Sequence, residues 1–211
     1  MPGLFVTLEG IEGSGKSTQA GLLEFALKVE GIPVRRTREP GGTPFSEEIR
    51  KLVLNLGEEP VFPETELLLF LAARAQHVRT LIQPALNSGE VVICDRFTDA
   101  TLAYQGGGRS AGITEVRRMN DWATGGLQPD RTFLIDIAVQ EGIARSRKRQ
   151  GNFGIDRIEQ EGPVFLEKVR EAYLSIADNE PNRIRVLDGS KSAEALARII
   201  LSDVKSMLVG R

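Results

Sequence analysis

A glycine-rich segment near the N-terminus has the composition of a phosphate-binding loop. Residues 9–18 read EGIEGSGKST, and Gly10, Gly15, Lys16 and Ser17 follow the spacing G-x-x-x-x-G-K-[ST]. Glycines let backbone N–H groups turn toward a ligand, and a following helix adds the positive end of its dipole. We therefore expect this loop to hold the phosphates of a nucleoside triphosphate.

The charged and hydroxyl side chains of the loop predict separate roles. Lys16 would reach the β- and γ-phosphates, and the Ser17 hydroxyl would ligate Mg²⁺. Phosphates repel a carboxylate, so Glu12 either accepts a hydrogen bond from a sugar hydroxyl of a neighbouring ligand or is a solvated loop residue. The predicted triphosphate site comprises Gly10, Ile11, Glu12, Gly13, Ser14, Gly15, Lys16, Ser17 and Thr18.

A second charged pair follows another apolar run. The sequence CDRF, residues 94–97, places Asp95 and Arg96 where a strand would end. Carboxyl ends of parallel strands form the ligand crevice of open α/β sheets, so both should emerge beside the phosphate loop. Arg96 could bind a phosphate with two N–H groups at any pH. Asp95 could hold Mg²⁺ directly, hold it through water, or orient Arg96.

The order of apolar runs predicts an α/β fold. Five short runs rich in β-branched residues alternate with helix-like stretches: Leu4–Leu8, Val34–Thr37, Val91–Cys94, Thr132–Ile135 and Ile184–Leu187. Parallel strands need such long connections, so we expect a parallel sheet with helices on both faces. Residues 145–157 carry charges and glycines without an apolar period and predict a helix end that runs into an exposed loop. We expect one domain over residues 1–211.

Composition excludes several classes of protein. The formal net charge is −2, which argues against a nucleic-acid partner. The apolar runs are too short for a membrane span. Cys94 is the single cysteine, so no intramolecular disulfide can form, and we expect a cytoplasmic protein. His77, the only histidine, is expected on a helix surface.

Four further motifs follow the phosphate loop in this order: TREPGGT (37–43), LLFLAARAQH (68–77), DRFTDATLAYQGGGR (95–109) and DRIEQE (156–161). Together with the loop, they closely resemble the bacterial thymidylate kinases over nearly the whole chain. The resemblance implies a P-loop kinase fold with a five-stranded parallel sheet and a short lid. It also implies ATP-dependent phosphorylation of dTMP to dTDP in dTTP biosynthesis, Mg²⁺ bound with ATP, and a homodimer.

The resemblance assigns residues to dTMP by position. By the resemblance, Phe70 would stack on thymine and Arg74 would hydrogen-bond the base. One helical turn separates them on one face, so both can point at a single base. Thr101 and Gln105 occupy base-contacting positions, and Tyr104 would crowd the sugar and disfavour a 2′-hydroxyl.

Charged residues carried over by the resemblance complete the acceptor site. Glu12 would contact the 3′-hydroxyl, and Arg96 would bind the acceptor phosphate with Arg38 and Arg50 nearby. The acceptor is a phosphate oxygen that is ionised at neutral pH, so positioning and electrostatics should dominate and no strong general base is needed.

A cluster of cations marks the predicted lid, residues 145–157. One branch of the family carries an arginine in the phosphate loop, where this chain has Gly13, so the chain resembles the branch whose catalytic arginine comes from the lid. We expect Arg149 to contact the transferring phosphoryl group and Arg145 to lie against adenine or the ATP phosphates. The segment QGNFGI after Arg149 is longer than in many relatives and leaves the choice among the lid arginines open; a solvated basic loop is the alternative.

Two other functions compete with this interpretation. A P-loop kinase could act on another monophosphate such as dCMP or AMP, which an acceptor assay would reveal. A nucleotide-dependent switch could keep the loop without fast turnover, but the chain lacks the N/T-K-x-D signature of guanine recognition.

Overall fold

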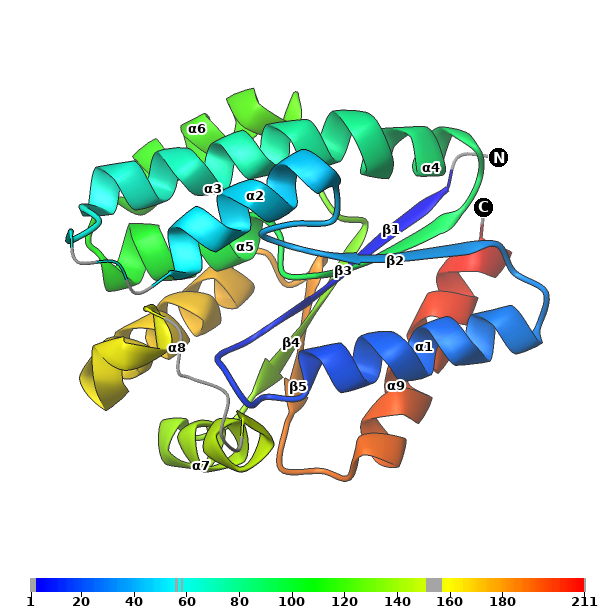
Figure 1. Ribbon diagram of the computed structural model, residues 1–211. Coiled ribbons are helices and arrows are strands. Elements are labelled where there is room, and N and C mark those ends of the chain that lie inside the picture. The colour runs from blue at the N-terminus through cyan, green and yellow to red at the C-terminus, as the bar shows by residue number, and fades with distance from the viewer. Residues whose placement is uncertain (1–2, 56, 58, 151–156, 211) are drawn as a thin grey trace.

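The computed structural model describes residues 3–55, 57, 59–150 and 157–210, and their strands form one parallel sheet. The sheet has five strands in the order β2-β3-β1-β4-β5 (Figure 1). Their bounds are β1 (Leu4–Glu9), β2 (Val34–Arg38), β3 (Val91–Asp95), β4 (Arg131–Asp136) and β5 (Ile184–Asp188). Each predicted run is confirmed as a strand.

The strands extend beyond the apolar runs at the edge where the site forms. The ladder pairs Leu8 with Asp95 and Glu9 with Leu134, so polar residues end β1 and β3 side by side. Every residue of the central strand β1 is buried, as expected for a parallel strand covered on both faces. The fold therefore delivers Glu9 and Asp95 to one edge of the sheet.

Helices cover both faces of the sheet (Figure 1). On one face, α1 (Lys16–Val29) and α9 (Ala193–Val209) pack Leu23, Leu27 and Ile200 against the strands. The other face carries α2 (Pro44–Leu54), α3 (Pro63–His77), α4 (Gln83–Asn87), α5 (Thr98–Thr101), α6 (Ile113–Thr124) and α8 (Gly162–Asn179). Two π-helical turns, Val78–Ile82 and Leu102–Gly108, continue α3 and α5. The predicted doubly covered α/β architecture is confirmed.

The predicted lid begins as a helix. Residues 145–150 form the last turns of α7 (Val139–Gln150), which follows β4. Residues 151–156 lie outside the described residues, and Arg157 precedes a short 3₁₀ turn, Glu159–Glu161, that leads into α8. Among the helices of the described ranges, none has both the length and the apolar character needed to cross a membrane.

Candidate active site

The phosphate loop adopts a backbone that only glycines tolerate at key positions. Gly10 has φ 137° and Gly13 has φ 74°, both in the region that disfavours side chains. A Cβ on Gly13 would lie 2.1 Å from the carbonyl oxygen of Gly142 in α7, and a Cβ on Gly142 would lie 2.6 Å from the carbonyl oxygen of Glu12. The loop and the helix that leads into the lid thus touch through backbone, and this contact leaves no room for an arginine at position 13.

The side chain of Lys16, at the start of α1, extends back toward the phosphate loop. Its Nζ donates to the carbonyl oxygen of Ile11 at 2.8 Å and reaches Ser14 Oγ at 3.4 Å. Burial and the charge of Arg96 lower the pKa of the Lys16 ammonium to about 8, although Asp95, Glu12 and Glu9 act in the opposite direction. The ammonium therefore lies at the loop in a buried position where water solvates its charge poorly.

One pocket at the carboxyl edge of the sheet joins the phosphate loop to the predicted acceptor residues. Its lining includes Lys16 and Ser17 of the loop. All predicted dTMP-binding residues line the same pocket: Glu12, Arg38, Arg50, Phe70, Arg74, Arg96, Thr101, Tyr104 and Gln105. The structure therefore brings together two sets of residues that lie as much as about ninety residues apart in sequence.

Other residues predicted in the triphosphate site lie at the back or rim of the loop. Ile11 and Ser14 are buried beneath the loop. Thr18 is exposed in the first turn of α1. Gly10 connects the loop to β1, and a Cβ there would lie 2.5 Å from the carbonyl oxygen of Ile135. These residues shape the loop without lining the pocket.

Arg96 stands at the junction of the two halves. Its Nη2 donates to Glu12 Oε1 at 2.8 Å and to the Tyr104 hydroxyl at 3.1 Å, and its Nη1 donates to the Tyr173 hydroxyl at 3.2 Å. The guanidinium lies 4.9 Å from the centre of the Tyr104 ring, within the range of a cation–π contact. Arg96 is thus fixed from three sides while it faces the pocket.

Glu12 turns away from the phosphate loop and toward Arg96. The Tyr104 hydroxyl lies 2.8 Å from both carboxylate oxygens of Glu12. Burial raises the pKa of Glu12, but the charges of Arg96 and Lys16 outweigh it and hold the pKa below its usual range. The first of the two predicted alternatives therefore fits the geometry, since Glu12 is an ionised acceptor inside the pocket and not a solvated residue.

Ser17 and Asp95 provide oxygens for a cation between the loop and the end of β3. The Ser17 hydroxyl donates to Asp95 Oδ2 at 2.5 Å, and both residues line the pocket. A hydroxyl and a carboxylate are oxygen donors of the kind that Mg²⁺ prefers. Within the described ranges, no group of three or more histidine, cysteine or acidic residues could hold a metal by itself. The donor set fits Mg²⁺ that takes its other ligands from phosphate and water.

Arg74 reaches the pocket from a buried position on α3. Its Nε donates to Glu39, its Nη1 to Thr101 and Asn120, and its Nη2 to the carbonyl oxygen of Phe97, at 2.6–2.9 Å. These bonds occupy four of its five N–H groups and leave one on Nη2, as far as the described residues show. The side chain is therefore held rigidly, with one donor for a ligand.

A buried carboxylate that was not predicted from the sequence, Glu39, holds Arg74. Burial raises the pKa of Glu39, but Arg74 and His77 outweigh it and keep the pKa low. His77 is fully buried and lies 3.0 Å from Glu39, so the expectation of a surface histidine was wrong. It faces inward because its other ring nitrogen lies 2.7 Å from the Thr37 hydroxyl.

A second buried carboxylate supports the far end of the pocket. Glu66 accepts from Gln105 at 2.7 Å and from Arg157 at 2.6 Å, and it pairs with Arg109. Arg157 also donates to the carbonyl oxygen of Val53 at 3.0 Å. Arg157, the last residue of the predicted lid, is thereby tied to α2 and α3, next to a predicted base-contacting residue.

The predicted lid arginines are placed only in part. Arg145 donates to the carbonyl oxygen of Gly189 at 3.1 Å and pairs with Glu141, outside the lining of the pocket but against the loop that follows β5. Arg147 and Lys148 are exposed on α7. Arg149 lies in the last turn of that helix, and its side chain falls outside the described residues.

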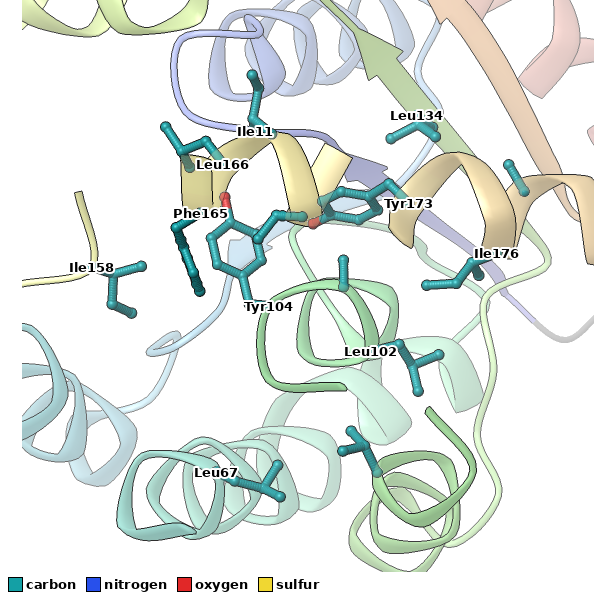
Figure 2. Packing of buried hydrophobic residues seen from close by; sticks show 14 of the residues in the cluster. Ile11, Leu67, Leu102, Tyr104, Leu134, Ile158, Phe165, Leu166, Tyr173 and Ile176 are labelled. Carbon is teal, nitrogen blue, oxygen red and sulfur yellow. The ribbon is translucent and has the colours of Figure 1, made fainter. Parts of the chain in front are cut away.

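The pocket residue Tyr104 packs in an aromatic cluster with residues of α8. Figure 2 shows Tyr104 and Tyr173 in one cluster with Phe165 and Leu166. The ring centres of Tyr104 and Tyr173 lie 6.2 Å apart in an edge-to-face arrangement. Pocket residues that the sequence analysis did not identify are Glu39, Pro40, Leu54, Ala100 and Ile158.

Comparisons with known proteins point to one family. The family described as thymidylate kinase matches residues 8–200. A thymidylate kinase of Pseudomonas putida (strain GB-1) is 48% identical over 210 residues, which cover 100% of this chain and 97% of the relative. One from Methylococcus capsulatus is 46% identical over 209 residues, 99% of this chain and 98% of the relative. The crystal structure of thymidylate kinase from Ehrlichia chaffeensis superposes with a TM-score of 0.77 at 31% identity, covering 97% and 99% of the two chains. The chain belongs to the thymidylate kinase family.

Proposed function

We propose that the pocket at the carboxyl edge of the sheet binds ATP at the phosphate loop and dTMP between Phe70 and Arg96. As a member of its family, the chain is a dTMP kinase that uses ATP to phosphorylate dTMP in dTTP synthesis. The observation that carries the site assignment is the continuous lining from Lys16 through Arg96 to Phe70. A cytoplasmic location remains a proposal that rests on the family.

On the donor side, the loop backbone and Lys16 would hold the triphosphate. Ser17 and Thr18 stand in the first turn of α1, where the helix dipole favours anions. Ser17 and Asp95 would hold Mg²⁺, which offsets the charge of the phosphate oxygens when bound. Asp95 would hold the ion directly or through water. Arg145, beside the loop after β5, would lie against the adenine side of ATP.

On the acceptor side, Arg96 would bind the dTMP phosphate, with Arg38 and Arg50 at the rim. Glu12 would accept a hydrogen bond from the 3′-hydroxyl, since its carboxylate is ionised and faces the pocket. The base would lie against Phe70 and take the remaining N–H of Arg74. Thr101, Tyr104 and Gln105 would contact the base and sugar from the opposite wall.

The chemistry needs an anionic acceptor and fixed positive charge. An oxygen of the dTMP phosphate attacks the γ-phosphorus of ATP, the bond to the β–γ bridging oxygen breaks, and ADP leaves. Lys16 and Arg96 would hold the two reacting phosphates together, and preorganised cations of this kind stabilise the charge of the transition state. Among the described pocket residues, none has to remove a proton for this step.

The pH dependence of ATP binding should follow the protonation of the Lys16 ammonium. Its pKa of about 8 in the free protein means that the ammonium loses its proton above that pH. A triphosphate favours the charged form, so the KM for ATP should stay level below pH 8 and rise roughly tenfold per unit above it. Initial rates between pH 7 and 9.5 at saturating dTMP measure this effect. A flat KM up to pH 9.5, with the fold intact by circular dichroism, would contradict it.

Arg149 is the lid residue that we propose for the transferring phosphoryl group. Arg149→Ala should lower kcat about 10²- to 10³-fold with little change in the KM for dTMP. Arg147→Ala is the matched control, since Arg147 is an exposed arginine of the same helix. A loss confined to the KM would place Arg149 in substrate binding, and a larger kcat effect of Arg147 would exchange their roles.

The choice of acceptor tests the proposed function. ADP release should depend on dTMP, with dCMP and AMP far weaker acceptors. Some dUMP should be phosphorylated, because one methyl group in an apolar pocket discriminates by only about 1 to 3 kcal/mol. Slow ADP release that is independent of any monophosphate would instead indicate a switch.

We also propose that two copies associate through α3 and α6, which pack together on the outer side of the sheet (Figure 1). Leu68 on α3 is 57% exposed and Trp122 on α6 is 84% exposed, so this face offers apolar surface for a second copy. Sedimentation should give a dimer for the wild type and a monomer for Leu68→Glu with Trp122→Glu. Phe25→Glu, on the opposite face, is the control. A wild-type monomer at micromolar concentration would contradict the proposal.

A further inference from the structure

Glu9 is a fully buried carboxylate to which the proposed mechanism gives no role. It ends β1, directly before the phosphate loop, and has 0% exposure. Its Oε1 accepts the backbone N–H of Phe97 at 2.6 Å, and its Oε2 accepts the Tyr173 hydroxyl at 2.7 Å. Both partners are direct neighbours of Arg96, one along the chain and one through its side chain.

The backbone at Arg96 needs support from outside its own turn. Arg96 has φ 69°, a left-handed conformation that is costly for a residue with a long side chain. Its N–H donates to the carbonyl oxygen of Leu8 at 3.0 Å, and the next N–H, that of Phe97, donates to Glu9. The last two residues of β1 therefore hold both sides of the strained residue.

The side chain of Arg96 is tied to Glu9 through Tyr173. The Tyr173 hydroxyl has one hydrogen, which it donates to Glu9 Oε2, so its oxygen remains to accept Arg96 Nη1 at 3.2 Å. These two hydrogen-bond directions require an acceptor at the position of Glu9 Oε2. An amide nitrogen at that position would donate to Tyr173 and leave its hydroxyl hydrogen to compete with Arg96.

We propose that Glu9 is a positioning residue that sets both the backbone and the guanidinium of Arg96 for the acceptor phosphate. The proposal rests on the assignment of that phosphate to Arg96. Glu9 itself would touch neither substrate, since its carboxylate is enclosed by the turn after β3 and by α8.

The stability of the fold separates this role from a purely structural one. Burial and Asp99 raise the pKa of Glu9 to about 7, against the effects of Arg96, Tyr173 and the Phe97 N–H. Lys16 on α1 and Cys94 on β3 also interact electrostatically with Glu9. A folded pKa above the unfolded one means that stability falls as pH rises from about 4.5 through 7. At pH 8, a neutral group of the same shape should therefore not destabilise the protein.

Glu9→Gln and Tyr173→Phe, assayed at pH 8 with the full chain, test the proposal. Each should lower kcat/KM for dTMP about 10- to 100-fold, because small displacements of a reacting group are that costly, and leave the KM for ATP unchanged. The Tm of Glu9→Gln should equal or exceed that of the wild type. The double variant should lose little more than either single variant, since both act through one hydrogen-bond relay.

Asp203→Asn provides the matched control of a carboxylate exchanged for an amide. Asp203 pairs with Arg131 and Arg185 at the opposite edge of the sheet and has a side chain only 9% exposed. Asp203→Asn should leave the KM for ATP and the KM for dTMP unchanged. A kcat/KM for dTMP in Glu9→Gln equal to that of the wild type would overturn the proposal. A lower Tm together with equal decreases of kcat/KM for ATP and for dTMP would also overturn it.

A parallel measurement on Arg96→Lys separates this proposal from the proposed site. If Arg96→Lys leaves the KM for dTMP unchanged, the assignment of the acceptor phosphate fails. If it raises that KM and Glu9→Gln does not, only the role of Glu9 fails.

Discussion

Replacement of Lys16 by alanine is expected to lower phosphoryl transfer by about 10³-fold or more while the protein stays folded. Lys16 is the loop cation that lines the pocket, and its ammonium is held at the loop by Ile11 and Ser14. Burial penalises its charged form, as the lowered pKa of about 8 indicates, so its removal should cost little folding stability. The effect should therefore appear in kcat and not in Tm.

Coupled detection of ADP, together with thermal unfolding, measures this effect. Lys28→Ala is the matched control, because Lys28 lies on the same helix with a side chain 59% exposed. The control should keep wild-type kcat. Near-normal turnover in folded Lys16→Ala would refute the role of the loop lysine.

Arg96→Lys is expected to raise the KM for dTMP about 100-fold, the largest effect that we predict on acceptor binding. Lysine keeps the positive charge, so Glu12 retains a cation beside it. A single ammonium cannot reproduce the planar guanidinium, which donates to Glu12, Tyr104 and Tyr173 together and would offer its remaining N–H groups to the phosphate. A loss of about 2 to 3 kcal/mol is expected when charge-assisted bonds of this kind are removed.

Steady-state kinetics with each substrate varied in turn checks this expectation. The KM for ATP should change little, since Lys16 and the loop remain. Arg35→Lys is the control for the same exchange. Arg35 lies on the edge strand β2 and forms an exposed ion pair with Glu90. An unchanged KM for dTMP in Arg96→Lys would remove the acceptor phosphate from this residue.

The sequence was sufficient to predict the sheet and the phosphate loop because both depend on local patterns. Most strands are short apolar runs, although β2 reads VRRTR, and the parallel direction of the strands follows from their alternation with helices. The loop needs glycines at fixed offsets, which the spacing around Lys16 displays directly. Each strand ends one residue later than predicted, because the hydrogen-bond ladder continues through polar residues such as Glu9 and Asp95.

The supporting carboxylates could not be predicted because their partners are distant in sequence. Glu39 meets Arg74 across 35 residues and Glu66 meets Arg157 across 91 residues. A lone glutamate in a strand end or a helix is usually exposed, so residue type gave no signal. His77 was misplaced for the same reason, since its burial depends on Glu39 and Thr37 in another element.

The predicted dTMP residues came from the resemblance together with helical spacing. Phe70 and Arg74 lie one turn apart on α3, and both line the pocket. Without the resemblance, the apolar segment around Phe70 favours a core residue over a ligand contact. Position in the family, not residue chemistry, identified it.

A crystal structure with dTMP and a non-hydrolysable ATP analogue tests the central assignment most directly. We predict a dTMP phosphate hydrogen-bonded to the Arg96 guanidinium and a γ-phosphate hydrogen-bonded to Lys16 Nζ, with thymine against Phe70. A dTMP phosphate bound elsewhere, with Arg96 still closed on Glu12 and making no contact with it, would contradict the account.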